Sequence, residues 1–127
     1  MRRIKLITES AGELIIELTG RNPRTAEAIW RALPFESEAE RWGDEVYFRL
    51  PVKLRLRGER TLMEVGEVAY WPEGNSLCLF FGPTPASKDD RPVAYSDVKP
   101  LGRVVEGLQS LKRIRDGEEV RVEIEKD

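Results

Sequence analysis

Histidine is absent from this chain of 127 residues, and cysteine occurs once. Without histidine there is no Ser-His-Asp triad, no Cys-His nucleophile, no imidazole ligand for zinc and no general base with an ordinary pKa near neutral pH. The single Cys78 excludes an internal disulfide and a thiolate metal cluster, so nothing in the chain requires an oxidising compartment. We therefore expect a cytoplasmic protein that lacks the residues for most familiar hydrolase mechanisms.

Long apolar runs are missing as well. No segment approaches the roughly 18 consecutive apolar residues of a membrane-spanning helix, and residues 1–6 alternate charged with apolar side chains where a secretory signal has an apolar block. The net charge of −2 is too balanced for attraction to a phosphate backbone to dominate. We expect neither a membrane nor a nucleic acid as a partner, and no cofactor or metal. The number of subunits stays open.

Amide side chains are scarce, because Asn22, Asn75 and Gln109 are the three in the chain. Arginine (15) outnumbers lysine (6), and glutamate (17) outnumbers aspartate (6). Ion-pair networks stabilise proteins more at high temperature, where labile amides are avoided. The composition therefore favours a protein from a thermophile.

Hydrophobic residues make up 40% of the chain and charged residues 35%. This balance is typical of a soluble globular protein, and a chain of this length fits one hydrophobic core. We expect a single domain over residues 1–127.

Apolar and polar residues alternate with a period of two along most of the chain, which predicts β-strands. The alternating segments are residues 4–6, 14–18, 46–50, 98–104 and 120–124, together with a hairpin over 65–81 whose turn is 71–76. The alternation also continues from Val52 to Leu56, beyond a bend at Pro51. Residues 77–81 are apolar on both faces, which predicts a central, covered strand.

Two helices are expected between the strands. Asn22 is a candidate side-chain cap, and Pro23 suits the first position of a helix that ends at Pro34. Leu108, Leu111 and Ile114 predict a second, short helix. Seven or eight strands with two helices indicate a mostly antiparallel barrel or strongly curled sheet whose ends the helices close.

Several strings resemble the cyclophilins, the barrel-shaped peptidyl-prolyl isomerases. They are Thr25 to Leu33, Tyr47 to Pro51, Gly74 to Thr84 and Gly102 to Leu108, of which the last is similar to the family's Phe-Gly-Lys-Val-x-Glu-Gly-Met. Over nearly its full length the chain is more similar to small prokaryotic cyclophilin-like proteins of unknown function, through Trp42 to Phe48 and Gly66 to Pro85. The resemblance implies a mainly β fold, a closed eight-stranded, mostly antiparallel barrel with two capping α-helices.

The cyclophilin resemblance also suggests a site around Arg49. Prolyl isomerisation needs no nucleophile or metal, and an arginine can donate a hydrogen bond to the twisted prolyl amide. Arg49 is the candidate catalytic residue on the barrel exterior, and the resemblance offers Phe81 as a wall. However, the family's glutamine stretch after this strand is replaced by residues 52–57, and its tryptophan and histidine after the Phe-Phe strand are absent.

A binding module without turnover is the preferred interpretation, with isomerase activity as the alternative. The expected groove holds a peptide or small ligand and is lined by Tyr47, Arg49, Tyr70, Trp71 and Phe81, because aromatic rings beside an arginine are the usual composition of a binding hot spot. A third interpretation is metal-assisted or carboxylate chemistry through Asp44, Glu45, Glu64 and Glu67, although their spacing matches no known loop motif.

Overall fold

The computed structural model describes residues 2–126. In chain order its elements are β1 (Arg3–Thr8), β2 (Gly12–Leu18), α1 (Pro23–Ala32), β3 (Phe35–Arg41), β4 (Glu45–Arg49), β5 (Arg60–Leu62), β6 (Glu67–Trp71), β7 (Ser76–Phe80), β8 (Val93–Glu106), the 3₁₀ helix η1 (Leu108–Arg113) and β9 (Glu119–Ile124).

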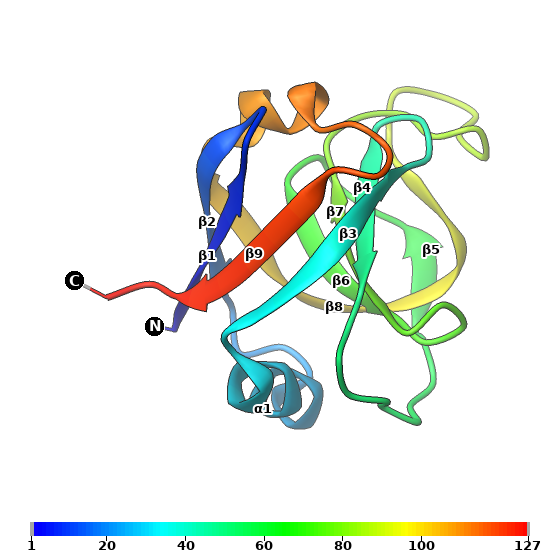
Figure 1. Cartoon of the computed structure of the whole chain (residues 1–127). Helices are drawn as coiled ribbons and strands as arrows, with labels where there is room; N and C mark the ends of the chain where they lie inside the picture. Colours follow the sequence, from blue (N-terminus) through cyan, green and yellow to red (C-terminus); the bar gives the residue numbers. More distant parts are fainter. Residues whose placement is uncertain (1, 127) are drawn as a thin grey trace.

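Eight of the strands form a closed barrel in the order β2-β1-β9-β3-β4-β7-β6-β8, and pairing of β2 with β8 closes the ring (Figure 1). All of these pairings are antiparallel. The 14 residues of β8 are enough for it to pair with β2, β6 and β5, and β5 extends the sheet from β8. The expected mainly β fold and eight-stranded barrel are therefore confirmed.

Alternate side chains of each strand fill the barrel interior. On β1 these are Ile4 and Leu6, and on β4 they are Val46 and Phe48, all of them at most 1% exposed. Tyr70 on β6 lies in the same core cluster. The period-two pattern in the sequence thus identified the inward face of these strands correctly.

A second, smaller core cluster covers part of the outer face of the barrel. It contains Met63, Ala69, Cys78, Phe80, Ala94 and Val98, with Tyr47 and Trp71 packed against it. Every residue of β7 is buried, and its inward Leu77 and Leu79 belong to the main core, whereas its outward Cys78 and Phe80 belong to this second cluster. The expectation of a central strand covered on both faces is confirmed.

The helix α1 covers the core with its apolar face, since Ala26 and Ile29 are buried and Trp30 packs against the core. The predicted cap was wrong. Asn22 adopts a left-handed conformation and makes no side-chain cap, because its amide nitrogen donates instead to the carbonyl of Pro100 on β8 at 2.8 Å.

The second helix is a 3₁₀ helix, so the expectation of two α-helices is corrected. Its apolar residues explain the difference, because Leu108, Leu111 and Ile114 recur every third residue. Three residues per turn is the period of a 3₁₀ helix, and this spacing turns all three side chains toward the core. Figure 1 shows η1 (orange) and α1 at opposite ends of the strands.

Several segments differ from the expected strands, and β5 is one that the sequence pattern did not predict. The alternation of residues 52–56 does not form a strand, and the segment is a loop whose Leu54 amide donates to Asn75 Oδ1 at 3.3 Å. In contrast, Phe35–Arg41 forms β3, which the sequence pattern did not predict. Only Phe35 and Ala39 of this strand are buried, so its apolar signal is weak.

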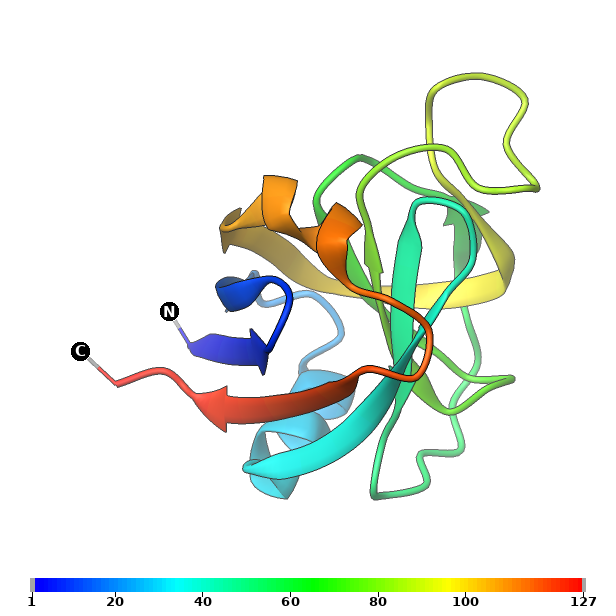
Figure 2. The same ribbon diagram turned by 45° about the horizontal axis from the view of Figure 1, so that its top comes forward.

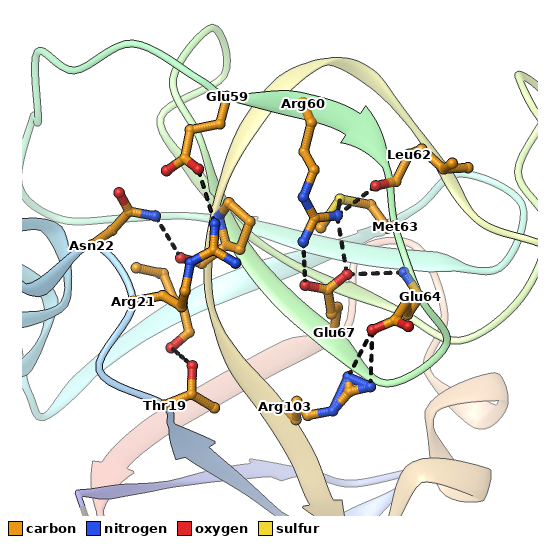
Figure 3. Close-up of polar contacts among 12 residues, drawn as sticks. Thr19, Arg21, Asn22, Glu59, Arg60, Leu62, Met63, Glu64, Glu67 and Arg103 are labelled. Atoms are coloured by element: carbon orange, nitrogen blue, oxygen red, sulfur yellow. Dashed lines mark hydrogen bonds and ion pairs between the residues drawn. The ribbon is translucent and has the colours of Figure 1, made fainter.

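A polar network fastens β5 to the barrel (Figure 3). The Arg60 guanidinium donates to both carboxylate oxygens of Glu67, at 3.2 and 2.7 Å, and to the carbonyl of Leu62. Glu67 also accepts the Glu64 amide at 2.9 Å, and Arg103 of β8 pairs with Glu64 at 3.3 Å. The Arg60–Glu67 pair is largely shielded from water, because Glu67 is only 7% exposed. This pair attaches β5 to β6.

The segment between β7 and β8, residues 81–92, projects from the barrel as a long loop (Figure 2). None of the helices in residues 2–126 has the length and apolar character needed to cross a membrane.

Candidate ligand-binding site

The outward face of β4 carries the side chains from which the candidate site is built. Since Val46 and Phe48 point inward, Glu45, Tyr47 and Arg49 point outward. Antiparallel pairing places Glu45 opposite Phe80 and Tyr47 opposite Cys78 on β7. The outward face of β4 therefore continues into the second core cluster.

A cavity of about 200 Å³ opens beside this cluster. Three parts of the fold build it: the turn before β4 with the start of β4, the end of β6, and the first half of β8. The residues that line it are Trp42, Glu45, Tyr47, Trp71, Ala94, Tyr95 and Val98.

Four aromatic rings border the cavity in edge-to-face contacts. The ring centroids are 5.6 Å apart for Tyr47 and Trp71, 6.0 Å for Trp71 and Tyr95, and 5.8 Å for Trp42 and Tyr95. Such contacts add to the stability gained by burying the rings. The chain of contacts runs from Tyr47 through Trp71 and Tyr95 to Trp42, so the rings position one another.

Trp71 is fixed from two further directions. Its indole nitrogen donates to the Ser96 hydroxyl at 2.7 Å. The ring also lies against Gly74 in the β6–β7 turn, where a Cβ atom would overlap it. Glycine at position 74 therefore leaves the space that the Trp71 ring occupies.

The tight turn before β4 positions Trp42 and Glu45. The amide of each donates to the carbonyl of the other, at 3.0 and 3.2 Å. Gly43 in this turn has a φ of 59°, and a Cβ there would lie 2.9 Å from the backbone of Thr84. Glycine suits this position for both reasons.

Among the described residues that line the cavity, Glu45 is the one that carries a carboxylate, and it is 4% exposed. Burial raises the pKa of the Glu45 carboxyl to about 7, and the neighbouring Cys78 thiol offsets the shift in part as a hydrogen-bond donor. Within residues 2–126, no ion pair joins Glu45 to a Lys or Arg side chain. The cavity thus combines apolar walls with a buried acid that titrates near neutral pH.

Cys78 lies behind Glu45 and is completely buried. Burial raises the pKa of its thiol well above the ordinary value, and the Glu45 carboxylate adds to the shift. A protonated, inaccessible thiol is a poor nucleophile, so Cys78 serves as a small core residue.

The structure brings two of the five expected site residues to the cavity, Tyr47 and Trp71. Arg49 is exposed on the same face of β4 but does not line the cavity. Tyr70 lies fully buried inside the barrel, where its hydroxyl donates to the carbonyl of Leu54 at 2.6 Å. Phe81 lies elsewhere, with the Arg41 guanidinium carbon 5.0 Å from the centroid of its ring.

Five residues of the cavity were not assigned to a binding groove from the sequence: Trp42, Glu45, Ala94, Tyr95 and Val98. Glu45 had a usable signal, because residues two apart on a strand share a face and Tyr47 was already placed outward. Trp42 and Tyr95 come from a turn and from β8, and no local pattern connects these segments.

The four carboxylates considered for metal chemistry do not converge. Glu67 pairs with Arg60, Glu64 with Arg103 and Asp44 with Arg41, while Glu45 lies in the cavity. In the described part of the chain, no three Cys, Asp or Glu side chains are grouped so that they could hold a metal ion.

Comparisons with known proteins agree with the fold. A family model described as "Cyclophilin-like" matches residues 2–123. The solution structure of the hypothetical protein AF2241 from Archaeoglobus fulgidus is 43% identical, with a TM-score of 0.82 over 96% of this chain and 93% of that one. McbB, solved in complex with tryptophan, is 22% identical, with a TM-score of 0.73 over 98% of this chain and 45% of McbB. A search of curated proteins gives no significant match.

Proposed function

Because this chain belongs to the cyclophilin-like family, a fold that can host unrelated activities, we propose a function from its cavity: the domain binds a small organic ligand among Trp42, Tyr47, Trp71 and Tyr95 without turnover. The binding module expected from the sequence is kept in this proposal, and its site moves along the outer face of the barrel.

The observation that carries the proposal is the set of four rings around one cavity. Tyr95 is 67% exposed although its ring contacts both Trp42 and Trp71. A protein gains little from keeping rings of this size beside an open cavity, whereas a ligand that enters it removes apolar surface from water. Apolar walls with few polar groups are the usual composition of a small-molecule site.

The size of the cavity favours a small ligand over a peptide. Pockets for drug-sized molecules have volumes of roughly 300–1,000 Å³, and this cavity has about 200 Å³. A compound with one ring or a short branched chain is of the right order. A peptide in an extended groove would need a longer surface than the seven residues of this cavity provide.

The relatives support the proposal to different extents. AF2241 is described as hypothetical and adds no ligand. The structure of McbB is of its complex with tryptophan, so a protein of this fold binds a small aromatic molecule. This chain spans 45% of McbB, and their likeness supports the fold alone, so the activity of McbB is not carried over.

Prolyl isomerisation with Arg49 remains the alternative proposal. Arg49 is four residues from Glu45 on one strand, which is about 13 Å at the usual rise of a β-strand. The isomerase would therefore need a second surface beyond Tyr47, outside the described cavity. The ring cavity supports the binding proposal and gives no support to this alternative.

Tryptophan fluorescence and thermal shift test the proposal together. The chain has three tryptophans, and a Trp30→Phe variant would retain only the two that line the cavity. Small aromatic and branched aliphatic compounds are screened for a rise in melting temperature. Those that raise it are then titrated against the Trp30→Phe variant, where we expect a saturable change in emission.

The matched control compares two tryptophan truncations. Trp71→Ala should abolish the thermal shift. Trp30→Ala should retain it, because Trp30 belongs to α1, lies under Arg2 and does not line the cavity. A screen without any binder, or equal binding by the wild type and Trp71→Ala, would contradict the proposal.

A further inference from the structure

Glu45 is a buried acid without a cationic partner in the described residues. Its neighbour Asp44 pairs with Arg41 at 3.6 Å. The Arg41 guanidinium also donates to the carbonyls of Gly43 and Ile114, at 3.0 and 2.9 Å. No Lys or Arg appears among the described residues that line the cavity. An ionised Glu45 would therefore face the cavity unpaired.

An unpaired buried carboxylate is costly, and the cost falls when a cation reaches it. The proton that Glu45 retains near neutral pH is one way to avoid the charge, since burial raises the pKa of this carboxyl to about 7. A cationic ligand is the other way. Its charge would replace the proton as the partner of Glu45.

The aromatic walls suit the same ligand. Rings attract cations that lie within about 6 Å of their centroids. Tyr47, Trp71 and Tyr95 border a cavity of about 200 Å³, so an ammonium group at Glu45 cannot be far from them. The apolar part of the ligand would cover the remaining ring surface.

Other ligand classes fit less well. An anion would meet the Glu45 carboxylate with no cation in the lining to offset the repulsion. A metal ion would find one carboxylate where three or more donors are needed. A neutral molecule would leave Glu45 protonated and would gain no charge-assisted hydrogen bond from it.

We propose that the cavity takes a primary ammonium ion carried on a small apolar body, with the ammonium N–H groups donating to the Glu45 carboxylate and the apolar body lying among the rings of Tyr47, Trp71 and Tyr95. This inference rests on the proposed function, since it names the ligand class of the same cavity.

Matched pairs of amines and alcohols test the inference. Phenethylamine, benzylamine and isopentylamine are compared with 2-phenylethanol, benzyl alcohol and isopentyl alcohol at pH 8, where both Glu45 and the amines are largely ionised. Each pair has nearly the same shape and differs in charge. We expect at least one amine to bind the wild type about tenfold or more tightly than its alcohol, because hydrogen bonds to charged groups are roughly twice as strong as neutral ones.

Glu45→Gln keeps the size of the side chain and removes its charge. The variant should bind the amine and the alcohol of a pair with similar affinity, and Glu73→Gln, an exposed control, should keep the preference of the wild type. Because the comparison of amine with alcohol is made in the wild type first, the test does not depend on the folding of a variant.

The outcomes separate the two proposals. If alcohols bind the wild type as tightly as their amines, the ammonium inference fails and the binding proposal stands. An amine preference that persists in Glu45→Gln also overturns the inference. If none of the six compounds binds, the ammonium inference fails, and the wider thermal-shift screen decides the binding proposal.

Discussion

The rings of Tyr47 and Trp71 meet edge to face, with centroids 5.6 Å apart and an interplanar angle of 83°. They come from β4 and β6, and β7 lies between these strands. The outward residues of β7 at this level are Ser76 and Cys78, as the pairing registers show. Because both side chains are small, the two rings can meet above β7 and form a wall of the cavity.

A larger side chain at position 78 should separate these rings. We expect Cys78→Leu to lower the free energy of unfolding by about 1–3 kcal/mol, as overpacking of a core does, and to abolish ligand binding. Urea unfolding and the thermal-shift assay measure the two effects.

The control for this change is Cys78→Ala, which adds no volume above β7 and should retain ligand binding. Unchanged binding by Cys78→Leu would show that the contact between Tyr47 and Trp71 does not form the wall of the site.

Glu45 should make the stability of the protein depend on pH. Its pKa is raised from an ordinary value of 4.5 to about 7 in the folded state, so the folded protein holds a proton that the unfolded chain has lost. The free energy of unfolding then falls as the pH rises from about 4.5 to 7. Above pH 7 the contribution of Glu45 no longer changes. From a shift of this size, we expect the free energy of unfolding of Glu45→Gln to rise, relative to that of the wild type, by up to roughly 3 kcal/mol between pH 4.5 and 8.

Urea unfolding of both proteins at pH 4.5 and 8 measures this difference, and the contributions of the other carboxyls cancel. Glu73→Gln, at an exposed position, should follow the wild type at both pH values. A constant difference between Glu45→Gln and the wild type would mean that Glu45 titrates normally.

The pair of Arg60 and Glu67 should matter more than the neighbouring pair of Arg103 and Glu64. Glu67 has a side chain that is 9% exposed, whereas Glu64 is 73% exposed. Arg60→Ala would leave a buried carboxylate without its partner, which we expect to cost about 1–3 kcal/mol. Arg103→Ala should cost about 1 kcal/mol or less, as is usual for exposed pairs. Equal costs in urea unfolding would contradict the assigned role of Arg60.

Prolyl isomerase activity tests the alternative proposal. A domain that binds without turnover should leave the isomerisation rate of proline tetrapeptides at its uncatalysed value in a protease-coupled assay, and Arg49→Ala should give the same rate. Acceleration by the wild type that is lost in Arg49→Ala would favour the alternative over the binding proposal.

The fold could be predicted from the sequence where one face of a strand is clearly apolar. Phe48 and its neighbours on β4 gave this signal, and the resemblance to cyclophilin-like proteins agreed with it. The strand β3 was not predicted, because Phe35 and Ala39 are its only buried residues and its apolar pattern is weak. The alternation from Val52 to Leu56 gave a false signal, because the segment lies in a loop with no strand partner in the described structure.

The site could be predicted only in part. Tyr70 and Trp71 are neighbours on β6, so their side chains point to opposite faces, and only Trp71 can line an outer site. Closure of the barrel and the path of β8 bring Tyr95 to Trp42, and this contact depends on tertiary structure rather than on local sequence. Glu45 was grouped with other carboxylates as a candidate metal ligand. Its burial could not be predicted, because it depends on residues of β7 and β8 that are distant in sequence.

Carbon-13 NMR of the Glu45 carboxyl tests the central claim most directly. Two titratable groups close to it, Cys78 and Tyr47, have raised pKa values, so both remain protonated around neutral pH. Our account predicts a titration midpoint near pH 7 in the free protein and a lower midpoint with saturating phenethylamine, because the ammonium favours the ionised carboxyl. A midpoint near the ordinary value of 4.5, or one that the amine does not move, would contradict it.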